Sequence, residues 1–144
     1  ARRRVERIVA CTDIVKVSDE DINWLAPGED PEQVASSWLS LGAAIVVLTK
    51  GGEGSIGFSA NGHVEVSAPN IDVVDTVGAG DSFMSGLLHF LAEADLLGAQ
   101  RREALAAVPV DTLAAMLTKA GRIAAITCTR AGANPPTLEE IDAE

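Results

Sequence analysis

Residues 75–83 read DTVGAGDSF and place two glycines and a carboxylate where an apolar, strand-like stretch leads into a long helix. Gly78, Ala79 and Gly80 carry almost no side chain, so their amides can converge on an anion. The helix that we expect over about residues 81–97 begins here. Unpaired amides and the macrodipole at a helix N-terminus both favour negative charge. The sequence therefore predicts a phosphate-binding turn.

Asp81, which follows the glycines, fits two roles. Its carboxylate can cap the new helix by accepting hydrogen bonds from backbone amides. It can also act as a general base toward a substrate hydroxyl. Both roles need a carboxylate at this place, so the turn by itself leaves both open.

The order of predicted elements indicates one α/β domain. A helix is expected over residues 2–10, a strand over 13–17, a helix capped by Ser18, a helix over 31–41 and a strand over 44–48. The last strand is a continuous apolar run, typical of a strand covered on both faces, and completes a βαβ unit. The Asn61-Gly62 pair predicts a hairpin between strands 55–60 and 63–68. Helices over 100–107 and 111–129 follow, and no internal repeat is present. We expect a mostly parallel central sheet.

A glycine-rich loop, Thr49-Lys50-Gly51-Gly52-Glu53-Gly54, comes directly after the buried strand. It lies at the carboxyl edge of the predicted sheet, where open α/β proteins place ligands. The loop contains no GxxxxGK[ST] motif, so it is not a Walker loop. A plain tight turn is the competing interpretation. Lys50 is interpreted as a solvated surface lysine rather than a phosphate ligand.

The formal charge of −10 and the pI near 4.5 exclude nucleic acid and anionic membranes as expected partners. A nucleotide such as ATP remains compatible, because local amides and Mg²⁺ can hold it on an acidic protein. No apolar run reaches the roughly 18 residues of a membrane span, and we expect a cytoplasmic protein. His63 and His89 have no partners at metal-ligand spacing.

Several residues are assigned to the core from helical spacing or residue type. Phe83, Met84, Leu87, Leu88 and Leu91 form the buried stripe of the helix after the glycine turn. Trp24, Trp38, Cys11 and Cys128 are also expected to be buried.

The DTVGAGDSF stretch resembles the C-terminal signature of the ribokinase-like (PfkB) carbohydrate kinases. Three further segments resemble the same family in the same order: DIVKVSDEDINWL at 13–25, VVLTKGGEGSIGF at 46–58 and CTRAGANPPT at 128–137. The first and last are most similar to bacterial fructokinases. The resemblance implies a three-layer αβα, ribokinase-like fold.

It also implies ATP-dependent phosphorylation of a primary sugar hydroxyl. Asp81 would be the general base, and the amides of Gly78, Ala79 and Gly80 would form the anion hole. The loop would bind ATP through Thr49, Gly51, Gly52 and Gly54. Gly121 would leave room beside the adenine, although a glycine can equally serve close helix packing.

Metal sites follow from the same resemblance. The family's NxxE motif, which organises Mg²⁺ mostly through water, corresponds here to Ser18-Asp19-Glu20-Asp21. Asp21 keeps a carboxylate for that shell, whereas a capping box of Ser18 and Asp21 is the alternative. A monovalent cation such as K⁺ would take the Asp75 side chain and the carbonyls of Val77, Arg130 and Gly132. Asp75 could equally make an ordinary turn hydrogen bond.

Kinases of this family are usually about twice the length of this 144-residue chain. We therefore expect residues 1–144 to form the C-terminal nucleotide-binding and catalytic portion, inactive alone, with the sugar-binding and lid portion absent. Exposed sheet edges would favour a homodimer or other self-association. A non-catalytic nucleotide-binding module is the alternative function. A dinucleotide-binding domain is disfavoured, because Phe83 stands where GxGxxG requires its third glycine.

Overall fold

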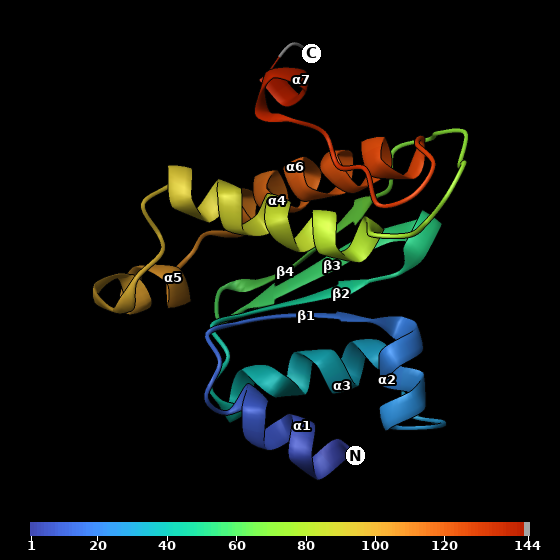
Figure 1. The fold of residues 1–144 in the computed structure, drawn as a ribbon. Coiled ribbons are helices and arrows are strands. Elements are labelled where there is room, and N and C mark those ends of the chain that lie inside the picture. The colour runs from blue at the N-terminus through green and yellow to red at the C-terminus, as the bar shows by residue number, and fades with distance from the viewer. Residues whose placement is uncertain (143–144) are drawn as a thin grey trace.

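A computed structural model describes residues 1–142 as three layers (Figure 1). A four-stranded sheet forms the middle layer. One face carries α1 (Arg2–Val9), α2 (Asp19–Leu25) and α3 (Pro31–Ser37), and the other carries α4 (Ala79–Glu93) and α6 (Val110–Cys128). The αβα arrangement expected from the sequence is confirmed.

The sheet has the order β1 (Ile14–Ser18), β2 (Ile45–Thr49), β3 (Gly54–Ser59) and β4 (Gly62–Ser67). β1 and β2 are parallel, as the predicted βαβ unit requires, whereas the β2–β3 and β3–β4 pairs are antiparallel. The expectation of a mostly parallel sheet is therefore wrong for these strands. The connections after β2 and β3 are too short for the crossover that two parallel strands need.

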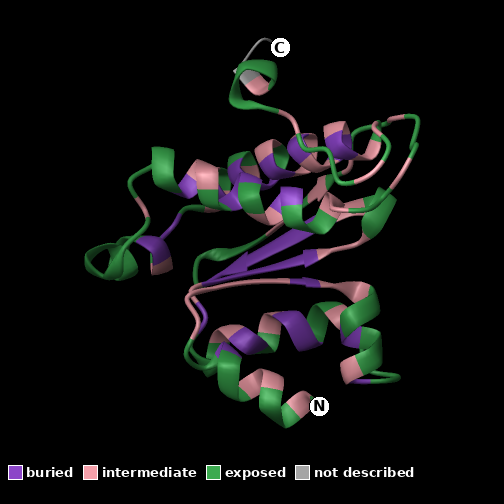
Figure 2. Cartoon of the chain, in the orientation of Figure 1, coloured by how far each residue is buried: buried purple, intermediate pink, exposed green. Residues whose placement is uncertain are grey.

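The central strand β2 divides the interior into two cores. Its side chains alternate across the sheet, so Val46 and Leu48 pack toward α1–α3 while Ile45 and Val47 pack toward α4 and α6. All four side chains are fully buried. Figure 2 shows this buried strand between two helical layers whose outer surfaces are exposed.

Local signals explain where the helices begin. The Oγ atom of Ser18 accepts a hydrogen bond of 3.0 Å from the Asp21 amide at the start of α2. Asp30 caps α3, with Pro31 in its first turn. The expected helix over 31–41 divides into α3 and the 3₁₀ segment η1 (Trp38–Leu41). The remaining short helices are η2 (Gly51–Glu53), η3 (Ala99–Arg101), α5 (Arg102–Ala106) and α7 (Leu138–Asp142).

Helices α4 and α6 pack closely because Gly86 has no side chain. A Cβ atom at Gly86 would lie 2.9 Å from the Cα atom of Ala120. Phe83, Leu87 and Leu91 are buried against α6, as the helical spacing predicts. Leu88 is 40% exposed, so its assignment to the buried stripe is wrong.

Two further core assignments are corrected. Trp38 is buried as expected, but Trp24 is 72% exposed. Trp24 is two positions after the buried Ile22, about 200° around the short helix, and therefore faces outward. Cys11 is exposed because it lies in the turn after α1, and Cys128 is partly buried.

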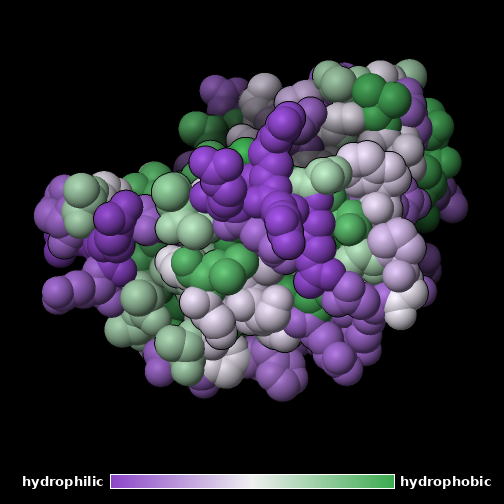
Figure 3. Space-filling view, turned by 90° about the horizontal axis from the view of Figure 1, so that it is seen from below, coloured by the Kyte–Doolittle hydropathy of each residue, from purple (hydrophilic) through white to green (hydrophobic). Residues whose placement is uncertain are grey.

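The outer face of the first helical layer is mixed in character. Figure 3 views the molecule from this side and shows a band of hydrophilic side chains across it.

Among residues 1–142, no single helix is long and apolar enough to cross a membrane. Residues 99–106 and 110–128 meet that criterion only as a pair bent by 109°.

Candidate active site

The glycine turn before α4 has a conformation that requires glycine. Gly78 has a φ of +80°, in the left-handed region that side chains disfavour. A Cβ atom at this position would lie 2.8 Å from the Cβ atom of Ala133. The loop after α6 therefore packs directly against the turn and fixes its shape.

The first amides of α4 are only partly available to a ligand. The Ala79 amide donates to the Thr76 carbonyl at 3.2 Å, so it is already used within the turn. The amides of Gly80 and Asp81 have no hydrogen-bond partner among residues 1–142. The Gly78 amide likewise donates to no residue of this range, so two amides of the predicted Gly78–Ala79–Gly80 set are unpaired, and the Asp81 amide adds a third donor.

The side chain of Asp81 is exposed in the first turn of α4. Within the described part of the chain it accepts no hydrogen bond from the helix start. Of its two sequence-based roles, capping is therefore not observed. The carboxylate remains open to a substrate group placed at the turn.

Asp75 holds together the segments on either side of this turn. Its Oδ1 atom accepts a hydrogen bond of 3.0 Å from the Val77 amide, and its Oδ2 atom accepts one of 2.9 Å from the Gly132 amide. These backbone donors hold the pKa of Asp75 below its usual range. The amides of Val74 and Asp75 in turn donate to the Cys128 carbonyl.

Of the residues expected to bind a monovalent cation, the structure brings Asp75, Val77 and Gly132 together by these hydrogen bonds. The Arg130 guanidinium donates to the Glu140 carboxylate at 2.7 Å, a side-chain contact that does not involve the carbonyl expected to bind the cation. The turn hydrogen bonds of Asp75 are thus observed. Within residues 1–142, no cluster of three His, Cys, Asp or Glu side chains is arranged to hold a metal ion.

Ser18 and Asp21 are occupied with each other. The Asp21 amide donates to Ser18 Oγ, and the Ser18 hydroxyl donates to Asp21 Oδ2 at 2.7 Å. The Ser18 half of the expected capping box is therefore formed at the start of α2, while the Asp21 carboxylate accepts from the Ser18 hydroxyl and not from its backbone amide.

The loop after β2 is tightly packed at its end. Gly54 has a φ of +119°, and a Cβ atom there would lie 2.1 Å from the Val66 carbonyl oxygen. Lys50 Nζ lies 3.4 Å from carboxylate oxygens of both Glu32 and Glu65. Its charge is balanced by these acidic residues, so it is not available as a free phosphate ligand.

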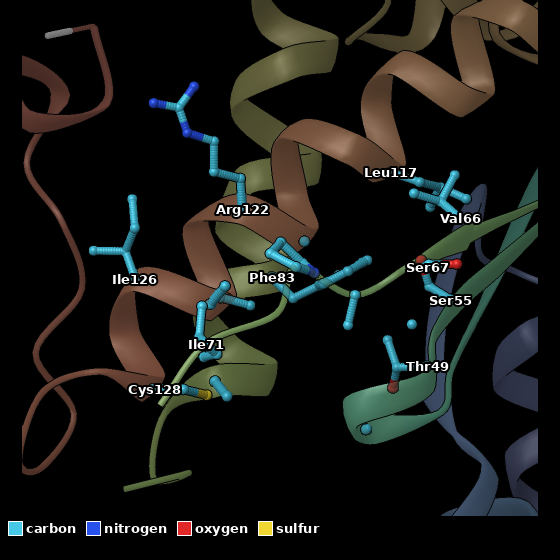
Figure 4. Close-up of a pocket in the computed structure, with 18 of the residues that line it drawn as sticks. Thr49, Ser55, Val66, Ser67, Ile71, Phe83, Leu117, Arg122, Ile126 and Cys128 are labelled. Atoms are coloured by element: carbon cyan, nitrogen blue, oxygen red, sulfur yellow. The ribbon is translucent and has the colours of Figure 1, made fainter. Parts of the chain in front are cut away.

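This loop, β4 and the two helices surround a cavity of about 800 Å³ (Figure 4). Thr49, Ser55 and Val66 lie on one side of it, Cys128 and Ile71 lie on the other, and Phe83 lies between them. Sequence-predicted residues in its lining are Thr49, Gly51, Gly54, Ala79, Gly80, Gly121 and Arg130. Gly52, Gly78 and Asp81 border the same segments without lining the cavity.

Gly121 leaves open space on the cavity side of α6. A Cβ atom there would meet only Phe83 Cε2, at the ordinary contact distance of 4.0 Å. Close helix packing therefore does not explain this glycine, in contrast to Gly86. The observation favours the alternative in which Gly121 leaves room for a ligand.

Sequence reasoning missed several lining residues. Leu117 and Cys128 share one face of α6 with the predicted Gly121, and their spacing of four and seven residues from it could have identified that face. Ser55, Val66 and Ser67 come from the hairpin, and no local signal distinguishes them from other strand residues.

Comparison with known proteins shows the family of the chain. The profile of the pfkB family of carbohydrate kinases matches residues 1–140. The chain belongs to this family. Fructokinase from Rhizobium leguminosarum bv. trifolii is 46% identical over 94 residues, covering 65% of this chain and 29% of that protein. Probable fructokinase-6, a chloroplastic protein of Arabidopsis thaliana, is 36% identical over 64% of this pfkB chain and 24% of its own length.

Solved structures of pfkB-like kinases have the same fold. Aminoimidazole riboside kinase from Salmonella enterica, complexed with aminoimidazole riboside and an ATP analogue, has a TM-score of 0.78 at 25% identity and covers 99% of this chain and 45% of its own. Vibrio cholerae fructokinase, bound to fructose, ADP and potassium, has a TM-score of 0.73 at 26% identity, over 92% of this chain and 39% of its own. The pfkB chain thus spans less than half the length of these relatives.

Proposed function

We propose that this chain supplies the nucleotide-binding and catalytic portion of an ATP-dependent sugar kinase that is most like a fructokinase. The observation that carries the proposal is the position of the unpaired Gly80 and Asp81 amides, at the start of α4 and beside the 800 Å³ cavity. Donors at a helix start suit the phosphates, and the cavity suits the rest of a nucleotide.

The apolar side of the cavity is the proposed adenine subsite. Phe83, Leu117 and Val66 offer apolar surface, and Gly121 leaves the space for a flat base. The ATP analogue in the Salmonella kinase structure supports a nucleotide as the ligand. From this subsite, the phosphates would extend toward the first turn of α4.

The open carboxylate of Asp81 is the proposed general base. It would accept the proton of a primary sugar hydroxyl as that oxygen attacks the terminal phosphorus of ATP. The Gly80 and Asp81 amides would donate to the oxygens of the transferred group, where negative charge must be stabilised. Mg²⁺ would bridge and neutralise the phosphates when bound, and the exposed Asp21 carboxylate could contact its water shell.

A monovalent cation site next to the turn is part of the proposal. The Asp75 carboxylate stays ionised because the Val77 and Gly132 amides lower its pKa. The potassium ion in the Vibrio fructokinase structure supports such a site in this fold. A cation there would hold the turn and the loop after α6 in place by neutralising their carbonyl dipoles.

A non-catalytic nucleotide-binding module is the second candidate. It is favoured by the Ser18–Asp21 pair, whose side chains hydrogen-bond each other where the family motif has Asn and Glu. Sugar-dependent ADP formation by the complete gene product separates the two candidates, because a binding module would produce none.

The direct test replaces Asp81 by Asn in the complete gene product. We expect kcat for sugar-dependent ADP formation to fall by about 10²–10⁴-fold while the affinity for ATP changes little. Asp111→Asn, an exposed aspartate in the first turn of α6, is the matched control and should keep full activity. Unchanged turnover in the Asp81 variant would remove this carboxylate from the mechanism.

A further inference from the structure

The chain has three lysines, and only Lys16 lacks an acidic partner among residues 1–142. Lys50 pairs with Glu32 and Glu65, and Lys119 pairs with Glu93. Within residues 1–142, Lys16 makes no hydrogen bond or ion pair. In a protein with a formal charge of −10, an unpaired lysine that is also half-buried needs a physical explanation.

Strand register places Lys16 on the side of the sheet that carries the site. Lys16 pairs with Val47, and Val47 packs into the core formed with α4 and α6. The neighbouring residues Val15 and Val17 face the opposite core, so strand alternation directs the Lys16 side chain toward α4. A charged residue thus interrupts the apolar face of β1.

The ammonium group lies against the glycine turn. A Cβ atom on Gly80 would be only 2.9 Å from Lys16 Nζ, so the amine occupies the space that a side chain at position 80 would need. The unpaired amides of Gly80 and Asp81 belong to the same turn. Two unpaired backbone donors and an ammonium group therefore lie at the same turn.

This arrangement is unfavourable unless an anion is present. The N-terminal end of α4 carries the positive end of the helix dipole, which repels a cation. Partial burial also removes water from the ammonium. A phosphoryl group between the two would relieve both costs, because its oxygens accept charge-assisted hydrogen bonds from the amine and from the amides.

We propose that Lys16 binds the terminal phosphoryl group of the nucleotide, together with the Gly80 and Asp81 amides. This assignment rests on the proposed kinase function and adds a residue to its site. Lys16 would supply a positive charge on the oxygens of the transferred group, two residues before the Ser18–Asp21 pair in which the family's Asn and Glu are replaced. The same charge would stabilise the group during transfer.

The test compares Lys16→Met, Lys16→Gln and Lys16→Arg in the complete gene product. Titrations use a Mg²⁺-bound, non-hydrolysable ATP analogue and, separately, adenosine, which lacks every phosphate. We expect the Met and Gln variants to bind the analogue about 10–100-fold more weakly, with adenosine affinity unchanged and kcat reduced. The Arg variant should recover part of both losses. Lys119→Met removes a paired lysine elsewhere and should behave as wild type.

Each other outcome has a definite meaning. Equal weakening of analogue and adenosine binding would show that Lys16 only supports the fold, and analogue binding unchanged in both the Met and Gln variants would remove it from the site. Either result overturns the assignment and leaves the kinase proposal standing. A wild-type protein that binds no triphosphate and forms no ADP would overturn the proposed function and this assignment together.

Discussion

The Oδ2 atom of Asp75 accepts a 2.9 Å hydrogen bond from the amide of Gly132, which lies 57 residues further along the chain. This contact fastens the loop after α6 to the segment that leads into the glycine turn. Because Gly78 also packs against Ala133, this one loop contacts the turn at two points. The shape of the candidate anion site therefore depends on long-range contacts as well as on its own sequence.

The pH dependence of stability should reveal the Asp75 contact. Its pKa is lowered from the usual 3.8, first by the Val77 amide and then by the Gly132 amide. A lowered pKa means that the ionised form stabilises the fold above pH 3.8, and that this stabilisation is lost as the pH falls through the folded-state value. We expect Asp75→Asn to be less stable than wild type near neutral pH. Urea unfolding midpoints should converge as the solution is acidified below pH 3.8, and a constant difference would contradict this.

The two tryptophans should respond very differently to truncation. Trp38 is 2% exposed and fills the core beneath α3, whereas Trp24 is 72% exposed. We expect Trp38→Ala to lower the free energy of unfolding by about 3–5 kcal/mol because it leaves a cavity. Trp24→Ala should change it by no more than about 0.5 kcal/mol. Urea unfolding followed by circular dichroism measures both, and similar losses would show that the burial assignment is wrong.

Two glycines of the loop after β2 provide a second matched pair. Gly54 combines a positive φ with a backbone oxygen 2.1 Å from any added Cβ atom, whereas Gly52 has open space within 4 Å. We expect Gly54→Ala to cost at least about 2 kcal/mol of stability, since the backbone must move. Gly52→Ala should remain within about 1 kcal/mol of wild type. Thermal unfolding measures the stability of both variants, and a Gly54→Ala variant as stable as wild type would contradict the loop geometry.

Thiol labelling should report on the cavity. Burial, followed by the negative charge of Asp75, raises the pKa of the Cys128 thiol, while Cys11 is exposed. Iodoacetamide should therefore modify Cys128 in a Cys11→Ser variant more slowly than Cys11 in a Cys128→Ser variant. A Mg²⁺-bound ATP analogue should slow labelling of Cys128 alone, because this residue lines the cavity. Protection of Cys11 instead would place the nucleotide elsewhere.

Much of the fold follows from local patterns in the sequence. The apolar run in β2, the Asn61-Gly62 hairpin and the Ser18 cap each act over a few residues, and the elements that they predict are present. The strand-like stretch before the glycine turn forms no strand, since β4 ends at Ser67 and the next element, α4, begins at Ala79. The relative direction of the strands was predicted less well. Antiparallel pairing of β2 with β3 follows from the short loop between them. The prediction of a mostly parallel sheet relied on what is general for α/β proteins and did not use the length of this loop.

Only those parts of the site that depend on neighbouring residues in the sequence could be predicted. The glycines of the turn could be identified because their lack of a side chain is itself the signal, whereas Gly121 was indicated only by the family resemblance. The use of the Ala79 amide by Thr76, and the approach of Lys16 to Gly80, depend on how distant segments pack. The prediction that Trp24 lies on the apolar face of its helix is wrong, because Trp24 is about 200° around this helix from the buried Ile22.

Hydrogen–deuterium exchange of the chain, with and without a Mg²⁺-bound non-hydrolysable ATP analogue, tests the central claim most directly. A nucleotide in the cavity should protect the amides of Gly80 and Asp81, the loop over residues 49–54 and the face of α6 around Gly121. NAD, measured in parallel, should protect none of them. Protection confined to other segments, or equal protection by NAD, would contradict the assignment of this cavity as an ATP site.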